Sequence, residues 1–315
     1  MSLAFTFPGQ GSQAVGMGAE LAEAFGAARE VFQEVDDALS QKLARLMREG
    51  PIEDLTLTEN AQPALMAVSL AVMRVLQREF GVDVTRAAFV AGHSLGEYSA
   101  LAAADALALG DTARLLKLRG QAMQRAVPVG EGAMASLIGP KADVALAEEA
   151  AAAGEAGGGV CVVANDNNAG NVVISGDKEA VDRAIAKAKE LGARAIPLNV
   201  SAPFHSPLML PAAEEMAQAL AKANVAAPRA PLVANVTARP TLDPETIRRL
   251  LVEQVTGRVR WRESIEWLLG EGGVTKFVEL GAGKALTGMA KRIAPDADAL
   301  AVNTPADLEA FAKSL

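Results

Sequence analysis

The sequence predicts an α/β fold, in which helices pack closely on a sheet. Half of its 315 residues are hydrophobic, which is enough for a sizeable core and too much for a disordered chain. Only 4% are aromatic, so alanine and glycine supply much of the apolar share, as expected for helices packed tightly on a sheet. The length suits one large domain or a main domain with a smaller companion.

Composition excludes several classes of protein. The 30 Lys and Arg against 38 Asp and Glu give a net charge of −8, which argues against nucleic-acid binding because such proteins usually carry a basic face. The single cysteine, Cys161, excludes an internal disulfide and a zinc site of several thiolates. The first apolar run stops at Pro8, too short for a signal peptide, and charges such as Glu97 interrupt the most apolar stretch, 88–109. We therefore expect a cytoplasmic protein without a membrane partner.

The N-terminal part is expected to supply the first strands and helices. Residues 3–7 alternate and carry two phenylalanines before a Pro-Gly turn, which predicts a strand. Residues 61–80 repeat Leu, Met and Val at helical spacing, which predicts a buried helix capped by Gly81. A short apolar strand at 87–90 and an alanine-rich helix at 97–109 follow.

A change of pattern near residue 130 predicts an inserted subdomain. The expected elements are strands at 133–138, 160–163, 172–174 and 193–196, helices at 142–153 and 177–190, and a hairpin turn at the Asn-rich residues 165–170. Their order, βαββαβ, is that of a ferredoxin-like unit. We therefore expect a main domain made of residues 1–128 and 198–315, with a small subdomain at 129–197.

A serine stands between an expected strand and an expected helix. Residues 92–96, Gly-His-Ser-Leu-Gly, fit the Gly-x-Ser-x-Gly pattern of a nucleophile elbow. The glycines permit the tight turn that pushes the hydroxyl over the end of the sheet. The bare pattern also occurs as a structural glycine turn, but its position between strand and helix favours Ser94 as a nucleophile.

Two histidines are candidates for the base that a serine nucleophile needs. His93 adjoins Ser94, and neighbouring side chains diverge in a sharp turn, so we expect it to pack near the site without taking the proton. His205 remains by elimination, although a lone histidine is more often structural. No histidine follows it, so its orienting partner is either an acid or, as we favour, a main-chain carbonyl or a side-chain amide.

Five segments together resemble a known family. They are Phe-Pro-Gly-Gln-Gly-Ser-Gln at 7–13, Gly-His-Ser-Leu-Gly-Glu at 92–97, Leu-Arg-Gly-Gln-Ala-Met at 118–123, Pro-Phe-His at 203–205 and Glu-Leu-Gly-Ala-Gly-Lys at 279–284. In this order and spacing they resemble the malonyl-CoA:acyl carrier protein transacylases of type II fatty-acid synthesis and related acyltransferase domains. Each segment is moderately specific, whereas the five together are very specific and span nearly the whole chain.

The resemblance implies a fold and a reaction. The fold would be an α/β-hydrolase-like core with a mostly parallel sheet and an inserted ferredoxin-like subdomain. In the implied ping-pong reaction, Ser94 takes malonyl from malonyl-CoA and passes it to the phosphopantetheine thiol of acyl carrier protein, with His205 as base and then acid. The N–H groups of Gln10 and Leu95 would hold the oxyanion. The main-chain carbonyl of Gln254 would orient His205, and no cofactor or metal is implied.

Arg119 fits the substrate that the resemblance implies, because a planar guanidinium can meet both oxygens of the free malonyl carboxylate. Without the motif, the favoured interpretation of Arg119 is a solvated residue of an expected helix at 111–126. Phe204 resembles the malonyl-preferring version of its segment, where a bulky ring would crowd a methyl branch on the substrate. The other expected substrate-binding residues are Gln254, Met123 and His93.

Alternatives remain open at this level. A serine thioesterase or esterase would use Ser94 and His205 but pass the acyl group to water, a non-catalytic module would only bind carrier protein, and a polyketide pathway could use the same transacylase. Carrier proteins are acidic, so the arginine-rich segment 239–262 is a candidate docking face, although such a run is usually a solvated surface. We expect a monomer whose partners are acyl carrier protein and malonyl-CoA.

Overall fold

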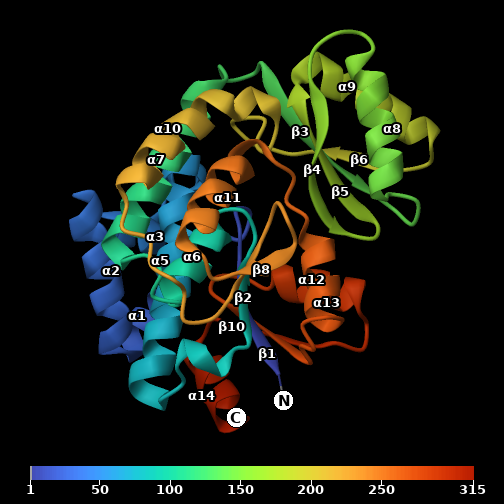
Figure 1. Cartoon of the computed structure of the whole chain (residues 1–315). Helices are drawn as coiled ribbons and strands as arrows, with labels where there is room; N and C mark the ends of the chain where they lie inside the picture. The colour runs from blue at the N-terminus through green and yellow to red at the C-terminus, as the bar shows by residue number, and fades with distance from the viewer. Residues whose placement is uncertain (1) are drawn as a thin grey trace.

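The computed structural model describes residues 2–315 and contains a mostly parallel sheet, sheet A (Figure 1). Its strands are β1 Leu3–Phe7, β2 Phe89–Gly92, β7 Leu232–Ala234, β8 Arg239–Thr241, β9 Lys276–Leu280 and β10 Asp298–Val302. The strand order is β10-β9-β1-β2-β7-β8, and the neighbouring strands run parallel except β7 and β8. The predicted α/β class with a mostly parallel sheet is confirmed.

Helices cover both faces of sheet A. They are α1 Ala19–Ala24, α2 Gly26–Leu39, α3 Leu43–Glu49, α4 Ile52–Thr56, α5 Thr58–Phe80, α6 Gly96–Ala103, α7 Leu109–Ala126, α10 Leu210–Lys222, α11 Pro244–Thr256, α12 Trp261–Leu269, α13 Ala285–Ile293 and α14 Pro305–Lys313, with 3-10 turns at Val84–Arg86 and Pro207–Met209. In Figure 1, α5, α6 and α7 lie on one side of the sheet and α12 and α13 on the other. Among residues 2–315, none of the helices has the length and apolar character needed to cross a bilayer.

The two faces of the sheet belong to separate hydrophobic clusters, because side chains alternate along a strand. In β1, Phe5 and Phe7 point into the large core shared with α2, α5 and α7, whereas Ala4 belongs to a smaller cluster with Trp261 and Leu286. The central strands are therefore buried on both faces, and their carboxyl ends are held rigidly. These ends carry the site described below.

A second, antiparallel sheet, sheet B, forms the upper right part of Figure 1. Its strands are β3 Gly132–Ile138, β4 Cys161–Asn168, β5 Asn171–Asp177 and β6 Arg194–Pro197, and its helices are α8 Val144–Glu155 and α9 Lys178–Glu190. The strand order is β4-β5-β3-β6, and a hydrophobic cluster of its own packs between this sheet and its helices. The predicted βαββαβ order is confirmed, and these elements lie between residues 129 and 197.

Two predicted element boundaries were wrong. The helix expected at 97–109 ends at Ala103, because the chain turns at Asp105, whose φ of 60° is left-handed, before α7 begins. The Asn-rich residues expected to form a turn are part of β4, and the chain reverses at Gly170, whose φ is 92°. Gly81, with a φ of 68°, caps α5 as predicted.

Candidate active site

Ser94 lies in a sharp turn at the carboxyl end of a central strand. β2 ends at Gly92, α6 begins at Gly96, and Ser94 between them has a left-handed φ of 53°. A Cβ on Gly92 would lie 1.9 Å from the carbonyl of Gly96, and one on Gly96 would lie 2.2 Å from the carbonyl oxygen of Phe7. Only glycine fits at either position, so these two residues create the elbow that presents the serine.

His205 lies within hydrogen-bonding distance of the Ser94 hydroxyl. Ser94 Oγ is 2.8 Å from His205 Nε2, and His205 Nδ1 is 2.9 Å from the main-chain oxygen of Gln254 and 3.2 Å from that of Gly257. Because both neighbours of Nδ1 are acceptors, this nitrogen carries the proton and Nε2 presents its lone pair to the serine. Of the alternatives left open by the sequence, the structure places main-chain carbonyls beside the histidine.

Burial keeps the His205 imidazole neutral. Its pKa is lowered to about 3, chiefly by burial and then by the positive charge of Arg119, while the two carbonyls act in the opposite direction. A histidine that is neutral near pH 7 can accept the serine proton directly. The local electrostatics therefore favour the base form of the pair.

The low pKa of His205 predicts a loss of stability in acid. Above pH 6.5 the imidazole is neutral in both states. As the pH falls from 6.5 toward about 3, the unfolded chain binds a proton that the folded chain does not, and the folded state is penalised. At pH 5 this term destabilises the protein by about 2 kcal/mol. Urea unfolding at pH 7 and pH 5 gives the decrease in the free energy of unfolding between these two pH values. This decrease should be about 2 kcal/mol smaller in His205→Asn than in the unaltered protein. Equal decreases would contradict the assignment.

Arg119 reaches the same serine from α7 and is almost fully buried, with 2% of its surface exposed. Its Nη1 donates to Gln62 Oε1 at 2.8 Å, and its Nη2 donates to Gln254 Oε1 at 2.8 Å and lies 3.2 Å from Ser94 Oγ. Burial lowers the pKa of this guanidinium. Within residues 2–315, its hydrogen-bonding partners are neutral groups and no carboxylate forms an ion pair with it. A buried cation so placed is suited to binding an anionic group beside the nucleophile.

A cavity of about 270 Å³ opens over these groups. Its lining includes eight of the expected residues, which are Gln10, His93, Ser94, Leu95, Arg119, Met123, Phe204 and His205. Neither the Gln10 N–H nor the Leu95 N–H donates a hydrogen bond within the described chain, residues 2–315. Both are therefore available to an oxyanion forming above Ser94.

The remaining expected residues take different places. His93 Nε2 lies 2.9 Å from Asn167 Oδ1, and its ring packs against Trp261, so it lines the wall and turns away from Ser94 Oγ. Gln254, expected to bind substrate, is fully buried behind Arg119 and does not line the cavity. Its side chain is occupied by Arg119 and by Glu97 instead.

Two polar residues of the site were missed from the sequence. Gln62 accepts from Arg119, and a buried glutamine within the apolar helix at 61–80 was the available signal. Asn235 follows β7 directly, accepts the Ser94 N–H at 2.8 Å and donates to the Gly92 carbonyl at 2.7 Å. A polar residue at the carboxyl end of a parallel strand is a common place for a site residue, but β7 was not predicted.

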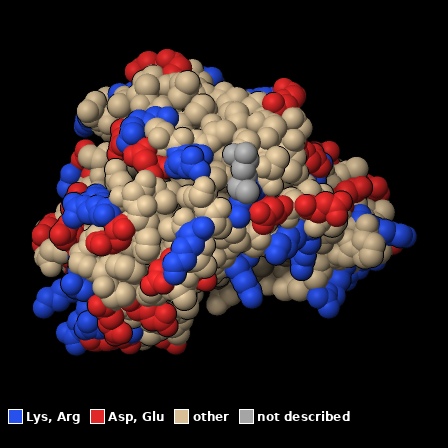
Figure 2. Space-filling view, turned by 90° about the horizontal axis from the view of Figure 1, so that it is seen from below, with Lys and Arg blue, Asp and Glu red and all other residues tan. Residues whose placement is uncertain are grey.

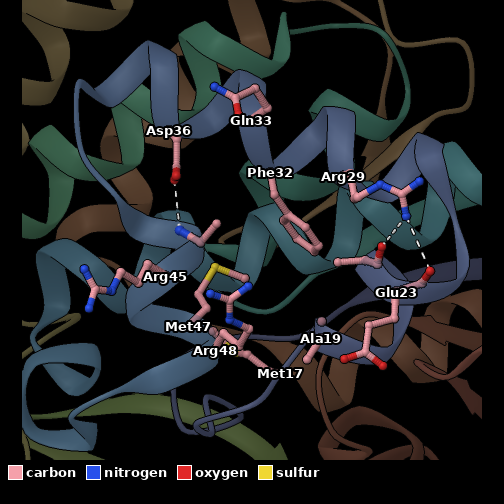
Figure 3. Close-up of a pocket in the computed structure, with 13 residues that line it drawn as sticks. Met17, Ala19, Glu23, Arg29, Phe32, Gln33, Asp36, Arg45, Met47 and Arg48 are labelled. Atoms are coloured by element: carbon pink, nitrogen blue, oxygen red, sulfur yellow. Dashed lines mark hydrogen bonds between the residues drawn. The ribbon is translucent and has the colours of Figure 1, made fainter.

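Another hollow, of about 540 Å³, lies among α1, α2 and α3 (Figure 3). Arg29 there donates to the main-chain oxygens of Ala22 and Glu23. Asp36 accepts from the Ala44 N–H at 2.9 Å. Among the residues that the structure describes, neither a serine nor a histidine lines this hollow, so it lacks the chemistry of the cavity over Ser94.

The arginine-rich segment 239–262 is largely neutralised by carboxylates. The ion pairs are Arg248–Glu245, Arg249–Glu253, Arg258–Glu148, Arg260–Glu263 and Arg262–Asp166. On the face seen in Figure 2, positive and negative side chains are likewise interspersed. The charge run thus forms paired surface groups, and its role as a docking face for carrier protein stays a prediction.

Comparison with known proteins agrees with this geometry. Residues 4–301 match the family model described as acyl transferase domain. The malonyl CoA-acyl carrier protein transacylase of Bacillus subtilis (strain 168) is 45% identical over 99% of this chain and 97% of that protein, and the one from Escherichia coli (strain K12) is 45% identical over 98% and 97%.

Solved structures agree as well. The acyl-carrier-protein-S-malonyltransferase from Bartonella henselae has a TM-score of 0.96 at 56% identity, covering 100% of this chain and 99% of that one. A malonyl-transacylase in complex with a type II PKS acyl-carrier protein has a TM-score of 0.95 at 42% identity, with 100% of each chain covered. The chain therefore belongs to the acyl transferase domain family and, within it, to the malonyl-CoA:acyl carrier protein transacylases.

Proposed function

We propose that this acyltransferase moves malonyl from malonyl-CoA to the phosphopantetheine thiol of acyl carrier protein through a malonyl ester on Ser94. The observation that carries the proposal is the buried Arg119, which has no carboxylate partner within residues 2–315 and lies 3.2 Å from Ser94 Oγ. A free carboxylate on the bound acyl group would supply the missing anion. An acyl group without one would leave the buried guanidinium without a directly bonded anion.

In the first half-reaction, Ser94 Oγ attacks the thioester carbonyl while His205 Nε2 takes its proton. The N–H groups of Gln10 and Leu95 would hold the oxyanion of the tetrahedral intermediate. When the intermediate collapses, the carbon–sulfur bond breaks and the CoA thiolate receives the proton from His205. CoA leaves as a free thiol, and malonyl remains on the serine.

The second half-reaction runs the same steps with a different thiol. His205 takes the proton of the phosphopantetheine thiol, and the sulfur attacks the ester carbonyl of malonyl-Ser94. Collapse of this intermediate expels the serine oxygen, which takes the proton back. The enzyme is restored and the overall exchange needs no cofactor, because the thioester consumed and the thioester formed are chemically equivalent, with the serine ester as the covalent intermediate.

The protein partner and the setting belong to the same proposal. One relative has been solved in complex with an acyl-carrier protein, and its fold matches this chain over its full length. We infer a cytoplasmic, monomeric enzyme that supplies malonyl groups for fatty-acid biosynthesis. The proposed division into a catalytic domain at 1–128 and 198–315 and a small subdomain at 129–197 places the cavity between them, since Met134 and Asn165 also line it.

A transferase must hold its acyl ester until a thiol arrives, whereas a thioesterase passes it to water. With malonyl-CoA alone, we expect the intact mass of the protein to rise by one malonyl group and little free malonate to form. Adding phosphopantetheinylated carrier protein should discharge the ester. Rapid multiple turnover to malonate in the absence of a thiol acceptor would instead identify a hydrolase.

A further inference from the structure

Glu97 is a buried carboxylate that the mechanism above does not use. It lies in the first turn of α6, three residues after Ser94, with 1% of its surface exposed. A glutamate in the first turn of a helix is usually explained by the helix dipole, as the sequence suggested. In the structure, its Oε2 accepts two hydrogen bonds from other elements, from Gln254 Nε2 at 2.7 Å and from the Asn235 N–H at 3.2 Å.

The contact with Gln254 fixes which way the glutamine amide faces. Gln254 Nε2 donates to Glu97 and to the Ser94 carbonyl, while Gln254 Oε1 accepts from Arg119 Nη2. If the amide were rotated by half a turn, its NH₂ would face the guanidinium N–H, and its oxygen would face the carboxylate and the carbonyl. Each of these contacts would be repulsive. The acceptor at Glu97 therefore selects the orientation that Arg119 requires.

The contact with Asn235 serves the nucleophile. The main-chain N–H of Asn235 donates to Glu97, and its side chain bridges the elbow from the Ser94 N–H to the Gly92 carbonyl. One carboxylate oxygen is thus shared by the residue that holds Arg119 and by the residue that holds the strained turn of Ser94.

We propose that Glu97 is a positioning residue that acts through Gln254 to keep Arg119 aimed at an acyl group on Ser94. The inference rests on the proposed malonyl transfer. The role needs a hydrogen-bond acceptor and not a full negative charge. In agreement, burial raises the pKa of Glu97 to about 7, against the effects of Gln254, Asn235 and Arg119, and a neutral carboxyl still keeps an acceptor oxygen.

The test compares kcat/KM for malonyl-CoA and acetyl-CoA, because a merely structural defect lowers the active fraction equally for both donors. Glu97→Met keeps an unbranched side chain of similar length but has no strong acceptor, so we expect it to lower the malonyl-to-acetyl ratio by at least about tenfold. Glu97→Gln keeps an acceptor oxygen and should hold the ratio within about threefold of the unaltered protein. Equal losses for both donors in Glu97→Met, or a fall in Glu97→Gln as large as that in Glu97→Met, would overturn the proposal.

Gln254→Ala tests the route of the effect, and it retains the carbonyl that faces His205. It should lower the ratio as Glu97→Met does, and the double variant should fall no further, since the two residues act in one chain. Multiplying effects would show that Glu97 acts independently of Gln254. Should Glu97→Met fail to fold, an unchanged ratio in Gln254→Ala would by itself overturn the proposal.

Glu279 provides the matched control. It is also a buried carboxylate, 1% exposed, that accepts main-chain N–H groups, here those of Leu286 and Thr287 at the start of α13. Glu279→Gln should leave the malonyl-to-acetyl ratio unchanged, and a shift equal to that of Glu97→Met would count against a specific role of Glu97.

The failure of this inference can be told apart from the failure of the proposed function. If the unaltered protein formed no malonyl-Ser94 at all, the proposed function would fail first. If it formed the ester and the ratio ignored Glu97, only this inference would fail.

Discussion

Ser94→Ala is expected to abolish malonyl transfer, lowering kcat/KM by at least about 10⁴-fold, because the reaction then has no oxygen to carry the acyl group. The substitution removes one partly buried hydroxyl and leaves the elbow glycines and the cavity in place. Intact-mass measurement after incubation with malonyl-CoA should show no added malonyl group. Peptide mapping of the unaltered protein should place the group on residue 94.

Ser99 gives a matched control on the same helix. It is fully buried in α6, and its hydroxyl has no hydrogen-bonding partner within residues 2–315. Ser99→Ala should therefore keep activity within a few fold of normal. Transfer by Ser94→Ala at a rate within about tenfold of normal would show that a different group carries the acyl chain.

Arg119→Ala is expected to separate malonyl from acetyl donors. Truncating one partner of a buried, hydrogen-bonded charge pair costs about 2 to 5 kcal/mol, so malonyl kcat/KM should fall by about 30- to 4,000-fold. Acetyl has no carboxylate to lose, and its transfer should fall by about tenfold or less. The measurement is the rate of single-turnover acylation of Ser94 by malonyl-CoA and by acetyl-CoA.

Two further variants sharpen this experiment. Arg119→Lys keeps the charge but cannot present the planar fork, so the loss for malonyl should be intermediate. Arg125 lies on the same helix, is exposed and pairs with Glu215 at 2.7 Å, and Arg125→Ala should change neither rate. Equal losses for both acyl groups in Arg119→Ala would refute the role of this arginine in carboxylate binding.

Local patterns predicted much of the fold. The strand at β1, the glycine cap of α5 and the βαββαβ order of the small sheet follow from alternation, helical spacing and turn residues, which act over a few neighbouring positions. The boundaries that were wrong lie where such signals are weak. Alanine runs on through Asp105 without a glycine or proline, and the Asn-rich end of β4 is polar although it is buried.

The residues of the site also divide into those that local sequence determined and those that tertiary packing determined. The sequence by itself determined the nucleophile elbow, because two glycines around a serine dictate a local turn, and it determined the family, because five short segments keep their order. The partners of those residues were decided only by tertiary structure. Gln254 meets Arg119 across 135 positions and Glu97 across 157, and the Asn235 N–H meets Glu97 across 138. Such contacts depend on how α6, α7, α11 and β7 pack together, and burial, which sets the pKa of His205 and Glu97, exists only after that packing.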